Sequence, residues 1–354
     1  MKIAFWSFYE ENCVDMKMFH QADSVVAEGI FKKWNTLFQE CKLRGISIVG
    51  LNTVKDFEEV DFFVFSDFPR LTNPMVQKVL QSDKPKILII EEGPLIHPDN
   101  WKISNHKLFD YIFTWNDDYV DNIKYFKFNV HYIDNMEPIT GPKDKLCVLI
   151  ARNKRAWGKS ELYSERRNII RFFEKNHPDD FDLFGEGWDI FYFPSNVPIL
   201  KLFNGSKMFW FRSTLNEKYP SWKGAIEQKK AILNNYKFSI SLENSIGPTG
   251  YISEKIWDSF AAGTIPVYLG APNVLDYIPA NCFIDLRNFN GYEELYTYMS
   301  FMTEDVYNSY LENIYSFLNE QSKAGIFSDQ YFVKKFVELV DGKKQLRASN
   351  LESE

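Results

Sequence analysis

Apolar residues in the first third of the chain occur in short runs that polar stretches separate. These runs predict strands at Ile3–Phe8, Ile46–Leu51, Phe62–Phe65, Ile87–Ile90 and Tyr111–Thr114. Helices are predicted between them, near Val25–Cys41 and Pro74–Gln81. Strands that alternate with helices favour a parallel sheet with helices packed against it.

The same alternation resumes after a polar segment, Val130–Asp144, which carries two prolines and a glycine and is typical of a linker. Beyond it, the pattern predicts strands at Leu146–Ile150 and Phe181–Phe184, and helices at Glu161–Lys175, Ala225–Tyr236, Tyr292–Met302, Glu304–Glu320 and Gln330–Leu339. We therefore expect a domain over residues 1–135 and a second parallel α/β domain over residues 145–342. The mixed-charge end, residues 343–354, is expected to be disordered.

The stretch from Lys237 to Asp276 predicts a βαβ unit. Phe238, Ile240 and Leu242 alternate with polar residues, as in a strand, and a polar loop follows. Ser253 is the expected N-cap of a helix that ends at Gly263, after which an apolar strand resumes.

Polar residues gather where this predicted strand ends and the helix begins, which is where open α/β sheets bind ligands. Lys255, in the first helical turn, places a cation beside unpaired N–H groups, an arrangement that suits a diphosphate. Glu254 opposes that charge and suits a ribose diol, because a carboxylate accepts paired hydrogen bonds. The alternative interpretation is a charged first turn with no ligand.

Composition narrows the function. The 354 residues carry a net charge of −7, which argues against nucleic acid as the main partner. No apolar run approaches the roughly 20 residues that span a bilayer, and the start lacks the features of a signal peptide. The four cysteines and five histidines are dispersed, so neither a disulfide framework nor a metal site is indicated. We expect a soluble protein of the reducing cytoplasm, with at most peripheral membrane contact.

The segments SLENS, GYISEKIWDSFAAGTIPVYLGAPN, YIP and CFIDLRNF follow one another in the order found in α-1,3-fucosyltransferases. The chain thus resembles glycosyltransferase family 10, of the soluble bacterial type. The resemblance implies a GT-B fold, in which two Rossmann-like domains face a cleft. It also implies that the C-terminal domain binds GDP-fucose and the N-terminal domain binds the acceptor.

The resemblance also implies roles for individual residues. In YSERRNIIRFFEK, an arginine at the start of a helix would bind phosphate; Arg167 is the first choice and Arg166 the alternative, because spacing alone does not separate neighbours. The other donor-binding residues implied are Tyr251, Glu254 and Lys255, with Asn244 and Glu243 at the strand end.

The catalytic base of the family is a glutamate in an E-S-P element after a strand, and ILIIEEGPLIHP matches it with Gly93 in place of serine. Glu92 is therefore the expected base. A carboxylate at the end of an apolar strand is partly desolvated, which raises its pKa toward a useful value. His97 and Trp101, which follow it, are acceptor-binding candidates.

Together these features predict an inverting α-1,3-fucosyltransferase that moves L-fucose from GDP-fucose to a GlcNAc hydroxyl of a LacNAc-type glycan. No metal or other cofactor is expected. Two alternatives stay open, since fold does not fix function: a GT-B enzyme with another donor or linkage, including α-1,4, and a non-catalytic carbohydrate- or nucleotide-binding module.

Overall fold

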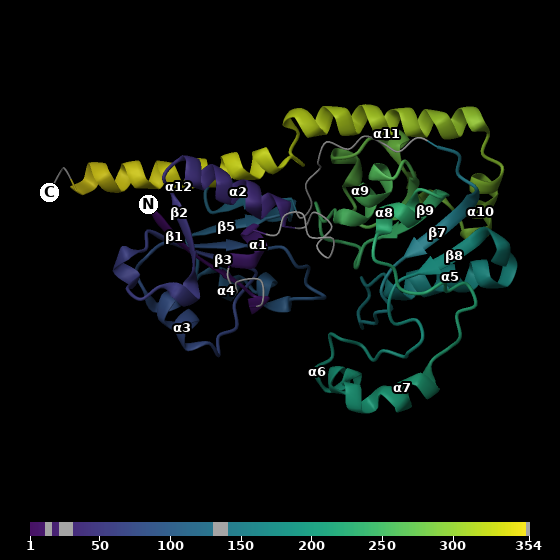
Figure 1. Ribbon diagram of the computed structural model, residues 1–354, viewed down its shortest axis with the longest axis horizontal. Helices are drawn as coiled ribbons and strands as arrows, with labels where there is room; N and C mark the ends of the chain where they lie inside the picture. Colours follow the sequence, from purple (N-terminus) through teal and green to yellow (C-terminus); the bar gives the residue numbers. More distant parts are fainter. Residues whose placement is uncertain (11–15, 21–30, 130–140, 352–354) are drawn as a thin grey trace. The chain divides into compact units, whose positions relative to one another are not determined.

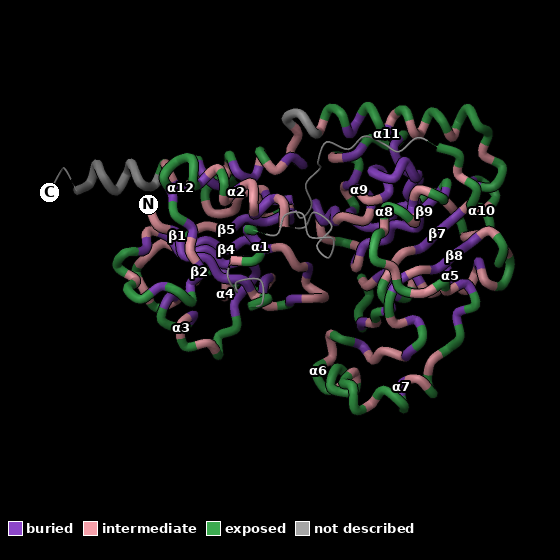
Figure 2. Tube along the Cα trace, in the orientation of Figure 1, coloured by how far each residue is buried: buried purple, intermediate pink, exposed green. Residues whose placement is uncertain are grey.

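The chain forms two α/β units, each built on a parallel sheet (Figure 1). The computed structural model describes residues 1–10, 16–20, 31–129 and 141–351. Unit 1 comprises residues 1–134 together with 321–354, and unit 2 comprises residues 135–320. Most of the predicted linker lies outside the described residues. In both units the central strands are deeply buried, as β3, β4 and β10 show (Figure 2).

The sheet of unit 1 has six parallel strands in the order β2-β1-β3-β4-β5-β6. They are β1 (Lys2–Ser7), β2 (Ser47–Gly50), β3 (Phe62–Ser66), β4 (Lys86–Ile89), β5 (Tyr111–Thr114) and β6 (Tyr125–Lys127). The first five confirm the strands predicted from the apolar runs. The sixth was not predicted, because β6 has only three residues, each of them half-buried.

Among the described residues, four α-helices accompany this sheet before the chain leaves unit 1. They are α1 (Lys17–His20), α2 (Lys32–Leu43), α3 (Pro74–Gln81) and α4 (Ile103–His106). Helix α3 has its predicted bounds, and Asn73 Oδ1 accepts the N–H of Met75 at 3.0 Å as its N-cap. For the helix predicted over Val25–Cys41, residues 25–30 lie outside the described residues, and α2 continues two residues further, to Leu43.

The C-terminal helix α12 (Asp329–Leu351) returns to unit 1, where it packs against α2. Its apolar stripe, which includes Phe332 and Phe336, joins the core of unit 1, and both rings lie within 6 Å of the Phe113 ring, at 5.8 and 5.9 Å. The sequence pattern instead assigned residues up to 342 to the C-terminal domain. An amphipathic stripe requires burial but does not specify the partner.

The tail expected to be disordered from residue 343 is helical as far as Leu351, and residues 352–354 lie outside the described residues. The physical reason is that α12 is already formed when it reaches residue 343. Extending a helix adds a hydrogen bond for each residue fixed and avoids the cost of a new nucleus.

Unit 2 contains a five-stranded parallel sheet in the order β11-β10-β9-β7-β8. The strands are β7 (Lys145–Ile150), β8 (Phe181–Phe184), β9 (Tyr236–Leu242), β10 (Ile265–Leu269) and β11 (Ile284–Asp285). The helices are α5 (Tyr163–Asn176), α6 (Pro198–Lys201), α7 (Phe209–Leu215), α8 (Lys229–Leu233), α9 (Glu254–Ala261), α10 (Tyr292–Ser300) and α11 (Glu304–Ala324). Helix α8 is shorter than the predicted Ala225–Tyr236.

The βαβ unit predicted from the signature stretch is present as β9, α9 and β10. Ile256, Trp257 and Phe260, the predicted apolar stripe of α9, are fully buried, and the Trp257 ring stacks on Phe317 of α11 at 6.0 Å. This packing fixes the direction of α9, whose first turn faces the carboxyl end of β9. The core thereby positions the polar loop that joins the two elements.

Candidate active site

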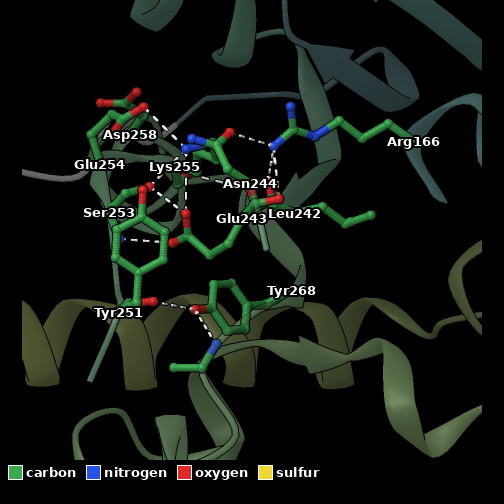
Figure 3. Close-up of polar contacts among 12 residues, drawn as sticks. Arg166, Leu242, Glu243, Asn244, Tyr251, Ser253, Glu254, Lys255, Asp258 and Tyr268 are labelled. Atoms are coloured by element: carbon green, nitrogen blue, oxygen red, sulfur yellow. Dashed lines mark hydrogen bonds and ion pairs between the residues drawn. The ribbon is translucent and has the colours of Figure 1, made fainter. Parts of the chain in front are cut away.

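The loop between β9 and α9 is built around a buried carboxylate, that of Glu243 (Figure 3). Its Oε1 accepts the backbone N–H of Ser253 at 2.7 Å, and its Oε2 accepts the Ser253 hydroxyl at 2.6 Å. Ser253 occupies the N-cap position, as expected, but its hydroxyl makes no capping bond to the first turn. Glu243 therefore fixes the start of α9 in place of a serine cap.

Lys255 lies beside this carboxylate in the first turn of α9. Its Nζ is 2.8 Å from Ser253 Oγ, 3.3 Å from Glu243 Oε2 and 3.4 Å from Glu254 Oε1. The side chain is 22 % exposed, so the ammonium group sits at a surface rather than in the core. The predicted neighbours Glu243, Glu254 and Lys255 thus share one hydrogen-bonded cluster.

Arg166 of α5 closes the other side of the strand end. Its Nη2 donates to the carbonyl oxygens of Leu242 at 2.6 Å and Glu243 at 2.8 Å, and to Asn244 Oδ1 at 3.2 Å (Figure 3). The residue is buried, and burial lowers the pKa of its guanidinium. Arg166 and Asn244 thereby hold the backbone that leaves β9.

Arg167 points elsewhere. Its Nη1 donates to the carbonyl of Lys154 at 3.1 Å and its Nη2 to the Ser164 hydroxyl at 3.0 Å. Arg167 is not among the residues that line the adjoining cavity, whereas Arg166 is. Of the two arginines that the sequence left open, the structure brings Arg166 to the cluster around Glu243.

A cavity of about 220 Å³ opens over the carboxyl ends of β7 and β9 and the first turn of α9. Its lining carries five cationic side chains: Arg152, Lys154, Arg166, Lys229 and Lys255. Two carboxylates, Glu254 and Asp258, also line it, and Asp258 pairs with Lys229 at 3.0 Å. Arg152 also pairs with Glu186, which is not part of the lining. A helix N-terminus together with five lining cations and two lining carboxylates favours a diphosphate here.

Sequence reasoning missed three of these cations. Arg152 and Lys154 directly follow the predicted strand Leu146–Ile150, so their position at the carboxyl end of a parallel strand was a usable signal. Lys229 begins α8, far from any motif, and nothing local distinguishes it from other lysines.

Tyr251 and Gly270 are packed closely around the loop between β9 and α9. Tyr251 is buried, its carbonyl accepts the Tyr268 hydroxyl at 3.4 Å, and it does not line the cavity. A Cβ on Gly270 would lie 2.4 Å from Glu243 Cγ and 2.5 Å from the Tyr268 oxygen. Glycine is therefore required at 270 for Glu243 to reach its buried position.

In unit 1, Glu92 follows β4 at the carboxyl end of the sheet. Its Oε1 accepts the hydroxyl of Tyr9 at 3.0 Å, and its backbone N–H donates to Asp67 Oδ1 at 3.0 Å. Burial, together with the Glu92 carboxylate, raises the pKa of Tyr9, which keeps the phenol protonated as a donor. Glu92 as a whole residue is half-buried, and its role as the base stays a prediction.

Asp67 holds the turn that carries Glu92. It has a positive φ of 59°, and its Oδ1 also accepts the N–H of Glu91 at 2.8 Å and Asn100 Nδ2 at 2.6 Å. Burial, and then the charges of Glu91 and Glu92, raise the pKa of Asp67 to about 8. Glu91 itself pairs with Lys33 at 2.8 Å. The two adjacent glutamates thus have different partners, Lys33 for Glu91 and Tyr9 for Glu92.

The two acceptor-binding candidates near Glu92 differ. His97 is buried, its Nε2 lies 2.7 Å from the Phe68 carbonyl and its ring centroid is 4.2 Å from that of Phe8, so the structure places it in packing rather than on a binding surface. Burial lowers the pKa of His97. Trp101 is half-buried, and its Nε1 donates to the Glu92 carbonyl at 3.1 Å.

Two kinds of feature are absent from the described residues. Across residues 1–10, 16–20, 31–129 and 141–351, no group of three or more His, Cys, Asp or Glu side chains is arranged to hold a metal ion. Within the same described ranges, no helix has the length and hydropathy needed to cross a bilayer. Cys41, Cys147 and Cys282 are buried free thiols.

The fold is that of the GT-B glycosyltransferases, as the sequence predicted. A crystal structure of an α1,3-fucosyltransferase superposes with a TM-score of 0.57 at 16% identity, over 96% of this chain and 90% of that one. The β-glucosyltransferase of T4 phage superposes with a TM-score of 0.53 at 13% identity, over 95% and 99% of the two chains.

Residues 213–331 match the model of the glycosyltransferase family 10 (fucosyltransferase) C-terminal domain. The chain is 32% identical over 90 residues to the α-(1,3)-fucosyltransferase FucT of Helicobacter pylori, which is 25% of this chain and 18% of that protein. It is 44% identical over 69 residues to mouse 4-galactosyl-N-acetylglucosaminide 3-α-L-fucosyltransferase 9, 19% of each chain. The chain thus spans less than a fifth of these relatives' lengths.

Proposed function

We propose that this chain is an inverting fucosyltransferase that moves L-fucose from GDP-fucose to a GlcNAc hydroxyl of a LacNAc-type glycan. The observation that carries the proposal is the cationic cavity of unit 2, whose wall at residues 239–259 falls within the family 10 match. A structure of an α1,3-fucosyltransferase with GDP also shares this fold, with a TM-score of 0.54 at 15% identity.

In the proposed reaction the diphosphate is the leaving group. Lys255 and the N–H groups of the first turn of α9 stabilise the charge that develops on it, and Arg166 adds a buried cation to the same wall. Glu254, beside Lys255, accepts hydrogen bonds from the ribose hydroxyls. No metal is required, because the protein itself supplies the positive charge.

The acceptor hydroxyl attacks the anomeric carbon of fucose on the face opposite the departing GDP. Glu92 takes the proton of that hydroxyl as the new glycosidic bond forms and the bond to the β-phosphate oxygen breaks. A single displacement inverts the anomeric centre. Tyr9, which donates to Glu92 Oε1 at 3.0 Å, orients the carboxylate for this step.

The relatives differ by name in linkage and in acceptor, so similarity to them does not decide either for this chain. The chain is 33% identical over 73 residues to an α-(1,4)-fucosyltransferase of Arabidopsis thaliana and 37% identical over 84 residues to GDP-fucose protein O-fucosyltransferase 3 of Gallus gallus. A protein acceptor is therefore a second candidate. The donor is common to our two candidates, since both would use GDP-fucose.

The test is a transfer assay with the purified full chain in the presence of a chelator. GDP-fucose, GDP-mannose and UDP-glucose are each offered with N-acetyllactosamine, a type 1 disaccharide and an unmodified peptide, and products are detected by mass spectrometry. We expect fucose on N-acetyllactosamine only, with an inverted anomeric centre by NMR. Transfer from another donor, or fucosylation of the peptide alone, contradicts the proposal.

A cytoplasmic location, consistent with the buried free thiols, stays a prediction.

A further inference from the structure

An excursion of unit 2, here called the platform and comprising residues 191–215, exposes an unusual amount of apolar surface. It contains α6 and α7 and lies apart from the sheet of unit 2 (Figure 1). Trp210 is 81% exposed, Leu202 78% and Ile199 70%. Figure 2 shows the same two helices as mostly exposed. Scattered apolar side chains need no explanation on a surface, but a group of them on one excursion does.

Contacts within the platform hold its two ends and its middle together. Its two ends meet where the N–H of Phe191 donates to the Arg212 carbonyl at 3.2 Å. Halfway along, the Asn204 side chain bonds both backbone groups of Phe193, at 2.9 and 3.0 Å. The Phe193 ring contacts those of Phe203 and Phe211, with centroids 5.5 and 6.5 Å apart. Phe193 is half-buried in this group, while Phe203 and Phe211 stay 41% and 48% exposed, so the ring contacts hold the platform together and leave its surface largely apolar.

The charge of the platform has one sign. Residues 190–216 contain Lys201, Lys207 and Arg212 and no aspartate or glutamate, whereas the whole chain carries −7. Both lysines are exposed and lie among the exposed apolar residues, while Arg212 is buried. Exposed tryptophan and aliphatic side chains with interspersed lysines are the composition of surfaces that insert at a bilayer interface.

We propose that the platform binds the interface of an anionic lipid bilayer, with Trp210, Leu202 and Ile199 inserted among the acyl chains and the two lysines at the headgroups. Anionic lipid attracts this basic patch, although it repels the acidic protein as a whole. The alternatives fit less well. In a two-fold dimer the same basic patch would form both sides of the contact, which brings like charges together. Trp210 offers a ring that could stack on a sugar, but the equally exposed Ile199 and Leu202 do not.

The test is flotation of the purified full chain with vesicles of phosphatidylcholine alone or of phosphatidylcholine mixed with phosphatidylglycerol. We expect binding to the mixed vesicles only, weakened by salt. Trp210→Ser with Leu202→Ser, and separately Lys201→Glu with Lys207→Glu, should each lower the partition coefficient at least tenfold. Circular dichroism spectra confirm that each variant is folded.

Two matched controls separate this surface from general effects. Phe301→Ser removes an aromatic ring that is 80% exposed elsewhere in unit 2, and Lys230→Glu with Lys334→Glu makes the same change in net charge away from the platform. Both should bind like the wild type. Absence of wild-type binding, or equal losses in variants and controls, overturns the proposal.

Other occupants of the platform give distinct results. If the wild type sediments as a dimer that Trp210→Ser dissociates while neither protein floats with vesicles, the surface binds a second copy. If Trp210→Ser raises KM for a soluble acceptor without changing flotation, the surface binds glycan. Either result overturns the membrane proposal. Vesicle binding needs no turnover, so it can succeed or fail independently of the proposed transferase activity.

Discussion

Glu243 and Ser253, ten residues apart at the two ends of one loop, are joined by hydrogen bonds of 2.7 and 2.6 Å. The carboxylate is fully buried, and burying such a charge is costly unless hydrogen bonds and a countercharge compensate it. Ser253 provides the hydrogen bonds, and Lys255 Nζ, at 3.3 Å, provides the countercharge. The loop that presents the first turn of α9 to the cavity is thus tied down from inside.

Lys255→Ala should weaken GDP binding. Removing a charged contact to phosphate costs on the order of 1.5–3 kcal/mol, which is about a tenfold to hundredfold rise in Kd. Titration calorimetry measures it. Lys230→Ala, an exposed lysine on neighbouring α8, is the control and should bind GDP like the wild type. Wild-type affinity in Lys255→Ala would make this lysine a loop-stabilising charge with no phosphate contact.

Gly270→Ala should destabilise unit 2 and weaken GDP binding together. The added Cβ would overlap Glu243 Cγ at 2.4 Å and displace the carboxylate that fixes Ser253. Overpacking of this kind costs about 1–3 kcal/mol, which lowers Tm by several degrees. Differential scanning calorimetry and GDP titration measure the two effects. Gly291→Ala, whose new methyl group meets nothing within 4 Å, should change neither. An unchanged Tm for Gly270→Ala would mean that the loop accommodates the methyl group.

The sheets were predictable because each buried strand is a short apolar run, and parallel order follows from the intervening helices. The surface against which an apolar helical stripe packs was not predictable. The side chains of Phe332 and Phe336 predict that α12 is buried on one face, yet only tertiary structure shows that they pack beside Phe113. Strand β6 escaped prediction since three half-buried residues give no periodicity.

Site residues were predictable where they are close in sequence. The apolar pattern located the end of strand β9 and the start of helix α9, and Glu254 and Lys255 lie at that helix start. Helix periodicity distinguishes Arg166 from Arg167: Arg166 shares a helix face with buried Ile169, Ile170 and Phe173, at spacings of three, four and seven. The packing of His97 had no such signal, because the Phe68 carbonyl that it contacts is 29 residues earlier.

Glu92→Gln should nearly abolish transfer while leaving GDP binding largely intact. The amide cannot take the proton of the acceptor hydroxyl, yet it retains an oxygen that can accept the Tyr9 hydroxyl. The effect of general-base catalysis is typically about 10²–10⁴-fold, so kcat should fall by that order. Initial rates with GDP-fucose and GDP titration measure the two quantities.

Asp118→Asn, an exposed carboxylate of the same unit, is the control for Glu92→Gln and should transfer at the wild-type rate. Glu91→Gln is a poor control, because it would leave Lys33 without its carboxylate partner at 2.8 Å. Turnover of Glu92→Gln equal to that of the wild type removes Glu92 from the mechanism. Loss of GDP affinity in parallel with turnover would instead indicate misfolding.

Asp67 should make the stability of unit 1 fall as pH rises. Its pKa is about 8 in the folded protein against an ordinary value of 3.8, so the folded state holds a proton that the unfolded state has released. Stability from this group is therefore fully present below about pH 4 and is lost as pH rises toward 8.

Asp67→Asn mimics the protonated acid and keeps an acceptor for the N–H groups of Glu91 and Glu92. Relative to the wild type, it should lose less stability between about pH 5 and 8 in urea denaturation. Asp121→Asn is the opposite control: backbone hydrogen bonds lower the pKa of Asp121, so its contribution changes only in acid. Parallel pH profiles for Asp67→Asn and the wild type would show that Asp67 is ionised in the fold.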